Sequence, residues 1–424
     1  MLASNKKQFA KGIAPKLAQR FLTCFVFSIF LLLVSDLCAQ TKLSDKDLLE
    51  QTIHFQIEGG FRFDSIARDL FSKEIQQAKI VAIAELHRSS EMSRFTAALI
   101  KLASLNDYEN IALEMGPISA KYAELIFKKS RRIAHVSKKI NTVYGIKSQG
   151  RGPLVFVDKV EDQWFLQALK DSDFKLWGLD QEYALSYEMH LDSLYAMLEV
   201  PTPRITQHYQ NLKLVIRDGG HQSFSKGKSE FNCNIIQNNR LLEFFTYFDG
   251  NEAAKKVIDA VKTSWEIYCL DERGKNAKQL RADYMKSNFD SLWSRIIGQD
   301  QRGKLLLKMG SAHLSRVKSP MGIEDLGKHI TEEVIGLPED FLVIKHLSRF
   351  TNGNDLLAEN NLEPLARFLA LGQQDQWTLI SLRPLRAMLK AGTIVAEEAI
   401  AFEINNYDYI LIPPDDKESG MLFH

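Results

Sequence analysis

The chain has 424 residues, of which 45% are hydrophobic and 25% are charged, and its formal net charge is +1. This length is ample for a large core, and the composition is that of a globular protein rather than a fibrous or disordered one. The near-neutral balance leaves no basic surplus for phosphate neutralisation, which argues against a nucleic-acid partner.

Residues 1–39 are predicted to be a signal peptide. The basic, acid-free segment 6–20 precedes an apolar run from Phe21 to Val34 of about 14 residues, shorter than the roughly 20 that span a membrane. A cleavage site would follow Ala39, although an uncleaved anchor and a lipid on Cys38 stay open as alternatives. Cleavage removes five positive charges and one negative charge, so the mature chain would carry −3. We expect a secreted or periplasmic protein that meets a membrane only through its N-terminal segment before cleavage.

The first half of the mature chain predicts alternating strands and helices. Residues 40–60 show no clear pattern and are expected to be irregular. Apolar residues at helical spacing predict a helix over 63–77. Apolar runs predict strands at 79–84 and 110–115, each followed by a helix. This strand-helix-strand-helix order implies parallel pairing with a right-handed crossover.

A third strand is predicted at 174–180, and the pattern from about 184 to 296 is helical. Such a block between strands is expected to be an insertion that roofs a site. Further strands are predicted at 304–309, 341–346, 378–382 and 407–412. Residues 40–424 therefore predict an α/β domain whose mostly parallel sheet carries helices on both faces.

Two cysteines, Cys233 and Cys269, would remain after cleavage. In an oxidising compartment they could pair. Two buried thiols on separate helices are an equally good interpretation, and no neighbouring ligands indicate a zinc site.

Polar side chains stand at the ends of the predicted strands. Glu85 and His87 follow the first strand, Glu114 closes the second, and His313 lies just beyond a later one. Ligands of open α/β sheets bind at the carboxyl ends of strands. A carboxylate beside a histidine fixes its tautomer and raises its basicity, so the set predicts acid–base catalysis. Arg88 follows directly and is predicted to contact a substrate.

Motifs for other chemistries are missing from the sequence. It contains no Gly-x-Ser-x-Gly elbow, no His-Glu-x-x-His zinc motif, no phosphate-binding loop of the Gly-Lys-Ser/Thr type and no dinucleotide fingerprint. Hydrolysis of a small-molecule substrate by an activated water is therefore favoured over covalent or nucleotide chemistry.

Six segments in order resemble the erythromycin esterase-like family, and the resemblance runs from about residue 78 to 413. The segments are Ala84-Glu85-Leu86-His87, Ile111-Ala112-Leu113-Glu114, 281–288, Met309-Gly310-Ser311-Ala312-His313, 326–330 and 407–412. The family implies ester hydrolysis without a cofactor or metal, by water that a histidine activates. His87 would then be the general base, with Glu85 and Glu114 orienting it or the water. His313 would assist at the oxyanion or the leaving group, and Arg281 would bind substrate from the helical roof.

The first segment departs from the esterases proper, which usually have Gly-Glu, two residues and then His. Here Ala84 replaces the glycine, and one residue separates Glu85 from His87. This form resembles the wider superfamily of Tiki/TraB-type and haem-uptake proteins. Two alternatives therefore stay open: a hydrolase or peptidase that uses a divalent metal, and a haem or small-ligand binding protein without turnover.

Overall fold

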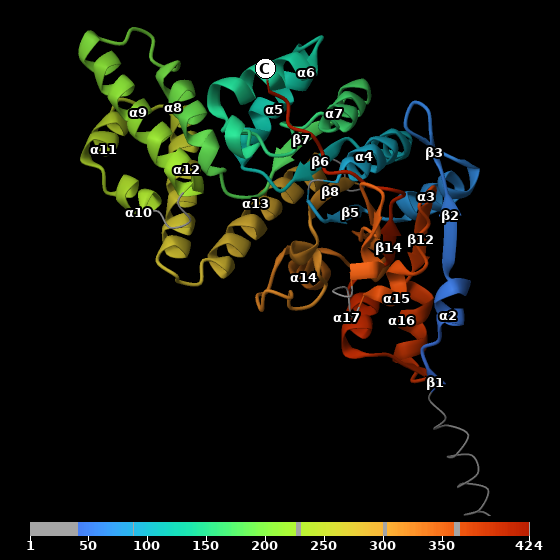
Figure 1. The fold of residues 1–424 in the computed structure, drawn as a ribbon. Coiled ribbons are helices and arrows are strands. Elements are labelled where there is room, and N and C mark those ends of the chain that lie inside the picture. Colours follow the sequence, from blue (N-terminus) through green and yellow to red (C-terminus); the bar gives the residue numbers. More distant parts are fainter. Residues whose placement is uncertain (1–40, 88, 226–229, 300–302, 360–364, 424) are drawn as a thin grey trace, which may run out of the picture.

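The computed structural model describes residues 41–87, 89–225, 230–299, 303–359 and 365–423 (Figure 1). The predicted signal peptide and Arg88 lie outside the described residues, so the predictions made for them stay predictions.

An eight-stranded sheet forms the centre of the molecule. Its strands, in spatial order, are β2 (Thr52–Phe55), β12 (Trp377–Ser381), β14 (Tyr409–Ile412), β9 (Phe341–His346), β5 (Ile80–Glu85), β8 (Leu305–Gly310), β6 (Asn110–Leu113) and β7 (Lys175–Gly178). From β14 to β7 every neighbouring pair is parallel, and only β12 runs against its two neighbours. The predicted α/β class with a mostly parallel sheet is confirmed.

The central strands are apolar on both faces because helices cover both. Along β5, Val81 and Ile83 pack into one hydrophobic cluster, whereas Ile80, Ala82 and Ala84 pack into another on the opposite face. This alternation follows from the period of two residues along a strand. It explains why the strand reads as a continuous apolar run in the sequence.

Two helical layers enclose the sheet (Figure 1). Helices packed into the first cluster are α3 (Ser65–Gln77), α4 (Ser90–Ala103), α5 (Pro117–Lys129), α6 (Ile133–Tyr144) and α7 (Asp162–Asp171). Helices packed into the second are α2 (Asp45–Glu50), α13 (Lys278–Gln299), α14 (Leu326–His329), α15 (Ala366–Leu369), α16 (Arg383–Lys390) and α17 (Glu398–Asn406). The three layers leave the carboxyl ends of the parallel strands as the natural place for a site.

Local capping fixes where the helices beside the sheet begin. The Ser89 hydroxyl accepts a hydrogen bond from the Met92 N–H at 3.0 Å, which caps α4 directly after β5. Pro117 opens α5 directly after β6, a position where its missing N–H is harmless. Each cap ends its strand-to-helix turn within a few residues, which keeps the polar residues of these turns at the edge of the sheet.

A helical insertion separates β7 from β8 and lies to one side of the sheet (Figure 1). It contains α8 (Tyr187–Tyr195), α9 (Pro203–Ser225), α10 (Phe231–Ile236), α11 (Asn239–Thr246) and α12 (Glu252–Glu272), and α13 returns the chain to the sheet. The insertion has its own core, in which Tyr187, Phe244 and Trp265 are buried. A disulfide joins Cys233 of α10 to Cys269 of α12, which settles the alternative left open by the sequence.

The prediction that residues 40–60 are irregular is wrong. This segment contains β1 (Thr41–Lys42), α2, β2 and β3 (Ile57–Glu58), and β2 pairs with β12 at the edge of the sheet. Of the remaining short strands, β1 pairs with the distant β13 (Ile394–Val395), whereas β3 pairs with the neighbouring β4 (Arg62–Phe63) and β10 (Phe350–Thr351) with the neighbouring β11 (Asn354–Asp355). These strands are too short to show a period, so their pairing determines them.

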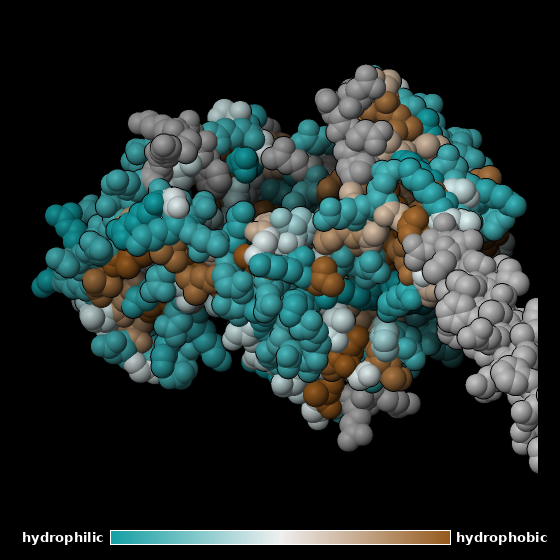
Figure 2. Space-filling view, turned by 90° about the horizontal axis from the view of Figure 1, so that it is seen from below, coloured by the Kyte–Doolittle hydropathy of each residue, from teal (hydrophilic) through white to brown (hydrophobic). Residues whose placement is uncertain are grey.

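The surface drawn in Figure 2 is largely hydrophilic, with hydrophobic areas separated by polar side chains. Among the helices of the described ranges, none has both the length and the hydropathy that crossing a membrane requires.

Candidate active site

A cavity of about 380 Å³ lies where the carboxyl ends of β5, β6 and β8 meet the return of the insertion. Its lining includes Glu85, His87, Glu114, Asp180, Arg281 and Lys308. A volume of this size suits a small molecule.

Glu85 and His87 meet at the end of β5. The His87 Nδ1 atom lies 3.0 Å from the Glu85 Oε1 atom. Glu85 is buried, whereas the His87 side chain is 52% exposed. The intervening backbone is held by His346 at the end of β9, whose Nδ1 accepts a hydrogen bond from the Leu86 N–H at 3.2 Å. A buried carboxylate therefore orients a histidine that faces the cavity.

Lys308 of β8 neutralises Glu85 within the interior. Its Nζ atom contacts the Glu85 Oε2 atom, and both side chains are buried. Burial alone would raise the pKa of Glu85, but the charge of Lys308 and the hydrogen bond with His87 outweigh it and hold that pKa below its ordinary value. The Lys308 ammonium also lies 4.4 Å from the centre of the Phe156 ring. Glu85 is thus ionised and fully partnered.

Glu114 lies on the other side of His87 and is also buried. Its Oε2 atom is 3.5 Å from the His87 Nε2 atom and accepts a hydrogen bond from the Gly310 N–H at 2.6 Å. A Cβ atom on Gly310 would lie 3.1 Å from each of the same two side-chain atoms, so glycine permits this close approach. Burial would raise the pKa of Glu114, but the charges of His313, His87 and Arg281 hold it well below its usual range.

Arg281 connects the insertion to the strand ends. From α13, its Nη2 atom donates to Glu114 Oε1 at 2.7 Å. The same guanidinium is bidentate to Asp180, with Nε–Oδ1 at 2.8 Å and Nη2–Oδ2 at 2.5 Å. Paired guanidinium bonds to a carboxylate are geometrically specific as well as strong. The fork therefore sets the position of α13 over the cavity that Arg281 lines.

His313 supports Glu114 from behind. It lies in a short 3₁₀ turn after β8, with Nε2 3.3 Å from Glu114 Oε1 and Nδ1 2.9 Å from Asp325 Oδ2. Burial would lower its pKa, but Glu114 and Asp325 raise it to about 10. His313 is therefore cationic at neutral pH. It is not among the described residues that line the cavity, so its contact with the reacting atoms stays a prediction.

Both carboxylates also act on His87. Burial would lower its pKa, but the hydrogen bond that His87 donates to Glu85 and the charge of Glu114 raise it above the ordinary value of 6.5. An imidazole of raised basicity beside a cavity is suited to accept a proton from water.

The tertiary structure thus brings Glu85, His87, Glu114, His313 and Arg281 into one cluster. Sequence reasoning missed Lys308, although a lone lysine within the apolar run 305–309 was a usable signal. It also missed Asp325, for which no sequence pattern exists. Tyr268 lines the cavity although its helical spacing indicates packing.

The donor set does not favour a divalent metal. Within the part of the chain that the structure describes, no group of three or more His, Cys, Asp or Glu side chains is arranged to hold a metal ion. The oxygens of Glu85 and Glu114 instead contact the cations of Lys308 and Arg281, and Glu114 also binds a backbone N–H. A metal would have to displace these partners, so we derive no step through one.

Solved structures share this fold. A mutant of the erythromycin esterase EreC in its open conformation matches with a TM-score of 0.53 and 16% identity, over 88% of this chain and 99% of its own. A Bacillus cereus protein matches with a TM-score of 0.53 and 14% identity, over 87% of this chain and 96% of its own. A succinoglycan biosynthesis protein matches with a TM-score of 0.50 and 14% identity, over 89% of this chain and 97% of its own.

No protein-family model matches the sequence, and the search among curated proteins found no significant match. At these identities the likeness to solved structures concerns the fold alone. At that level it confirms the resemblance seen in the sequence.

Proposed function

We propose that this protein is a hydrolase that cleaves an ester-like bond of a small molecule with water activated by His87. The observation that carries the proposal is a half-exposed imidazole with a buried carboxylate near each ring nitrogen. The shared fold with an erythromycin esterase supports the same reaction class.

Glu85 sets the tautomer of His87. An ionised carboxylate only accepts hydrogen bonds, so the Nδ1–H must donate to Glu85. The Nε2 lone pair is then free to accept, and Glu114 Oε2 lies 3.5 Å from it. One water can donate a hydrogen bond to each of these acceptors. This arrangement would hold the nucleophile against its base.

The attack of water on the carbonyl carbon then needs only residues of this cluster. His87 Nε2 takes a proton from the water while the water oxygen attacks the carbonyl carbon. The imidazolium that forms is stabilised by Glu85 and Glu114. Arg281 lines the cavity, and we assign it to anchoring the substrate. Its positive charge would also stabilise the oxyanion that develops on the carbonyl oxygen.

A panel of ester, lactone and peptide substrates, measured with and without chelator, tests the proposal. We expect ester hydrolysis that chelator does not abolish. Loss of activity on chelation that Mn, Co or Zn restores would replace the metal-free mechanism with the metal-dependent alternative. If no substrate turns over and haem titration produces a Soret band, the protein is a binding protein.

The pH profile of ester hydrolysis provides a further prediction. His87 is active as the neutral base, and its pKa is raised above 6.5. The kcat/KM for ester hydrolysis should therefore fall as the pH drops through the pKa of His87, which lies above 6.5. Glu114→Gln removes a negative charge that raises this pKa, so it should move the acid limb of kcat/KM to lower pH.

Glu109→Gln is the matched control, because Glu109 is exposed and lies directly before β6, whereas Glu114 lies directly after it. Its profile should superimpose on that of the wild type. An acid limb that Glu114→Gln leaves in place would remove Glu114 from the electrostatics of the base.

We also propose that the protein is exported. The basic and apolar character of residues 1–39 supports a signal peptide, and the disulfide between Cys233 and Cys269 suits an oxidising compartment. N-terminal sequencing of the native protein should begin at Gln40. A sequence that begins at Met1 would instead support an uncleaved anchor.

A further inference from the structure

A second wall of the cavity comes from the loop between α6 and α7 and from the C-terminal segment. This segment runs from β14 to end beside α6 (Figure 1). The N–H of Leu422 donates to the carbonyl of Asp158 at 3.0 Å, and the N–H of Val160 donates to the carbonyl of Gly420 at 2.8 Å. The amide of Asn141 also donates to the Asp158 carbonyl, at 2.9 Å. The backbone of Asp158 is therefore held from two sides.

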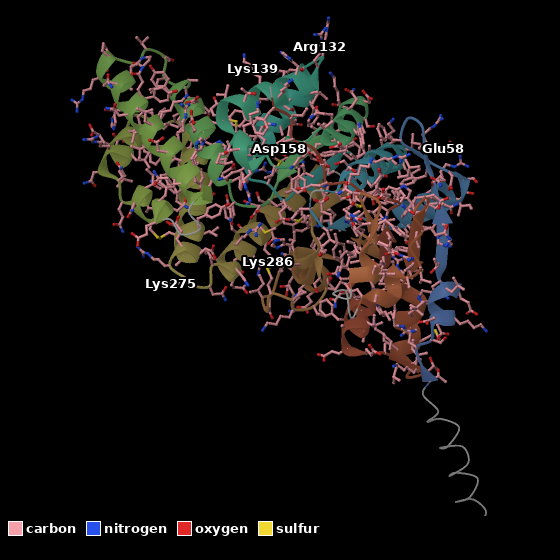
Figure 3. The ribbon with its side chains drawn as sticks, in the orientation of Figure 1. Glu58, Arg132, Lys139, Asp158, Lys275 and Lys286 are labelled. Atoms are coloured by element: carbon pink, nitrogen blue, oxygen red, sulfur yellow. A yellow bond between two sulfur atoms is a disulfide. The ribbon has the colours of Figure 1, made fainter. Side chains whose placement is uncertain are left out.

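Asp158 and Asp162 are two buried carboxyl groups in this wall, and both line the cavity. Figure 3 places Asp158 within the body of the molecule, away from the peripheral Arg132 and Lys275. The Gly152 N–H donates to Asp158 at 3.1 Å, and the Ser93 hydroxyl donates to Asp162 at 3.1 Å. In the described ranges, neither carboxyl forms an ion pair.

The approach of Gly152 to Asp158 leaves no room for a side chain. A Cβ atom on Gly152 would lie 2.6 Å from the Asp158 Cβ atom. Phe156, in the same loop, has a φ of 65°, a conformation that bulky residues rarely adopt. Its ring lies 5.9 Å from the His87 ring, measured between centroids. The loop is therefore shaped to bring Phe156 against His87 and Asp158 into the same cavity.

The surroundings favour a protonated Asp158. Burial raises its pKa, the neighbouring charge of Asp162 raises it further, and Lys159 opposes them, with a result of about 7. Burial also raises the pKa of Asp162, to about 6. The charge of Glu85 on β5 raises this pKa further, whereas the charge of Lys308 on β8 lowers it. Near neutral pH, Asp158 therefore keeps a proton in a substantial fraction of molecules.

Two other polar atoms belong to residues that line the cavity. The Ser419 hydroxyl and the Gln181 Oε1 atom are buried and find no hydrogen-bond partner among the described residues, although both residues line the cavity. Buried polar atoms cost free energy unless they are paired. They indicate that a ligand carrying hydroxyl or other polar groups completes this part of the cavity.

We propose that Asp158 is the general acid that protonates the leaving oxygen of the substrate, with Ser419 as a hydrogen-bonding partner of the leaving alcohol. This inference rests on the proposed ester hydrolysis. Water loses a proton to His87, and its oxygen bonds to the carbonyl carbon. The bond from that carbon to the leaving oxygen then breaks, and its electron pair stays on the leaving oxygen, which takes the proton of Asp158.

The products are a carboxylic acid and an alcohol, and one water is consumed. The Asp158 carboxylate then takes up a proton from solvent, and the His87 imidazolium releases its proton to solvent. The substrate class is therefore an ester of an ordinary alcohol, whose alkoxide is too basic to leave without a proton.

Asp158→Asn tests the assignment with two esters of the same acid. For an alkyl ester, kcat should fall about a hundredfold, at the low end of the range for acid–base catalysis. For the 4-nitrophenyl ester, kcat should be unchanged, because nitrophenolate leaves without protonation. Asp171→Asn is the control, since Asp171 is exposed at the end of α7, and it should leave both rates unchanged.

An equal loss on both esters, or a loss on neither, would overturn the role of Asp158 while leaving the hydrolase intact. Wild-type protein that hydrolyses neither ester would overturn the proposed function itself.

The wild type alone provides a second measurement that does not depend on folding of the variant. Its alkyl-ester kcat should fall at alkaline pH, whereas its nitrophenyl-ester kcat should not. Identical alkaline limbs would contradict the assignment.

Discussion

Replacing His87 with alanine is expected to lower ester turnover by about two to four orders of magnitude, the range typical of general acid–base catalysis. Alanine leaves the water without a base, while Glu85 and Glu114 keep their cationic partners Lys308 and Arg281. Because the His87 side chain is 52% exposed, its removal should leave no void in the core. The measurement is kcat for the best ester of the substrate panel, with the far-UV circular dichroism spectrum as a check on folding.

His135→Ala is the matched control for this variant. His135 is exposed on α6, and its replacement should leave kcat unchanged. Near-normal turnover in His87→Ala would remove His87 from the mechanism.

Replacing Lys308 with methionine is expected to lower the free energy of unfolding by about 3–5 kcal/mol, the cost of breaking a buried ion pair from one side. The side chains of Lys308 and Glu85 are only 3% and 4% exposed. Methionine fills a similar volume but leaves the Glu85 carboxylate without its counter-charge. Urea denaturation at neutral pH, followed by circular dichroism, would measure the loss.

The double variant Lys308→Met with Glu85→Leu should recover most of this stability, because it removes both charges instead of one. Lys42→Met breaks an exposed ion pair with Glu397 and should cost at most about 1 kcal/mol. If Lys308→Met costs no more than this exposed control, water reaches Glu85 and the pair is not a buried one.

Much of the fold follows from short contiguous segments. The strands β5 and β8 carry apolar residues on both faces, Ser89 caps the helix after β5, and Pro117 begins the helix after β6. Periodicity and capping act within a few residues, so a sequence shows them directly. The edge strand β2 escaped prediction because four residues carry no period and its partner β12 lies more than 300 positions away.

The sequence by itself determined which residues end the central strands, and therefore that Glu85, His87 and Glu114 lie at one edge of the sheet. This follows because parallel strands place their carboxyl ends together. Only the tertiary structure decided how these groups are charged and what faces them. Lys308 reaches Glu85 across 223 positions, and Arg281 reaches Glu114 across 167. Contacts between distant segments depend on the packing of whole elements, which no local pattern encodes, and the burial that shifts each pKa exists only once those elements have assembled.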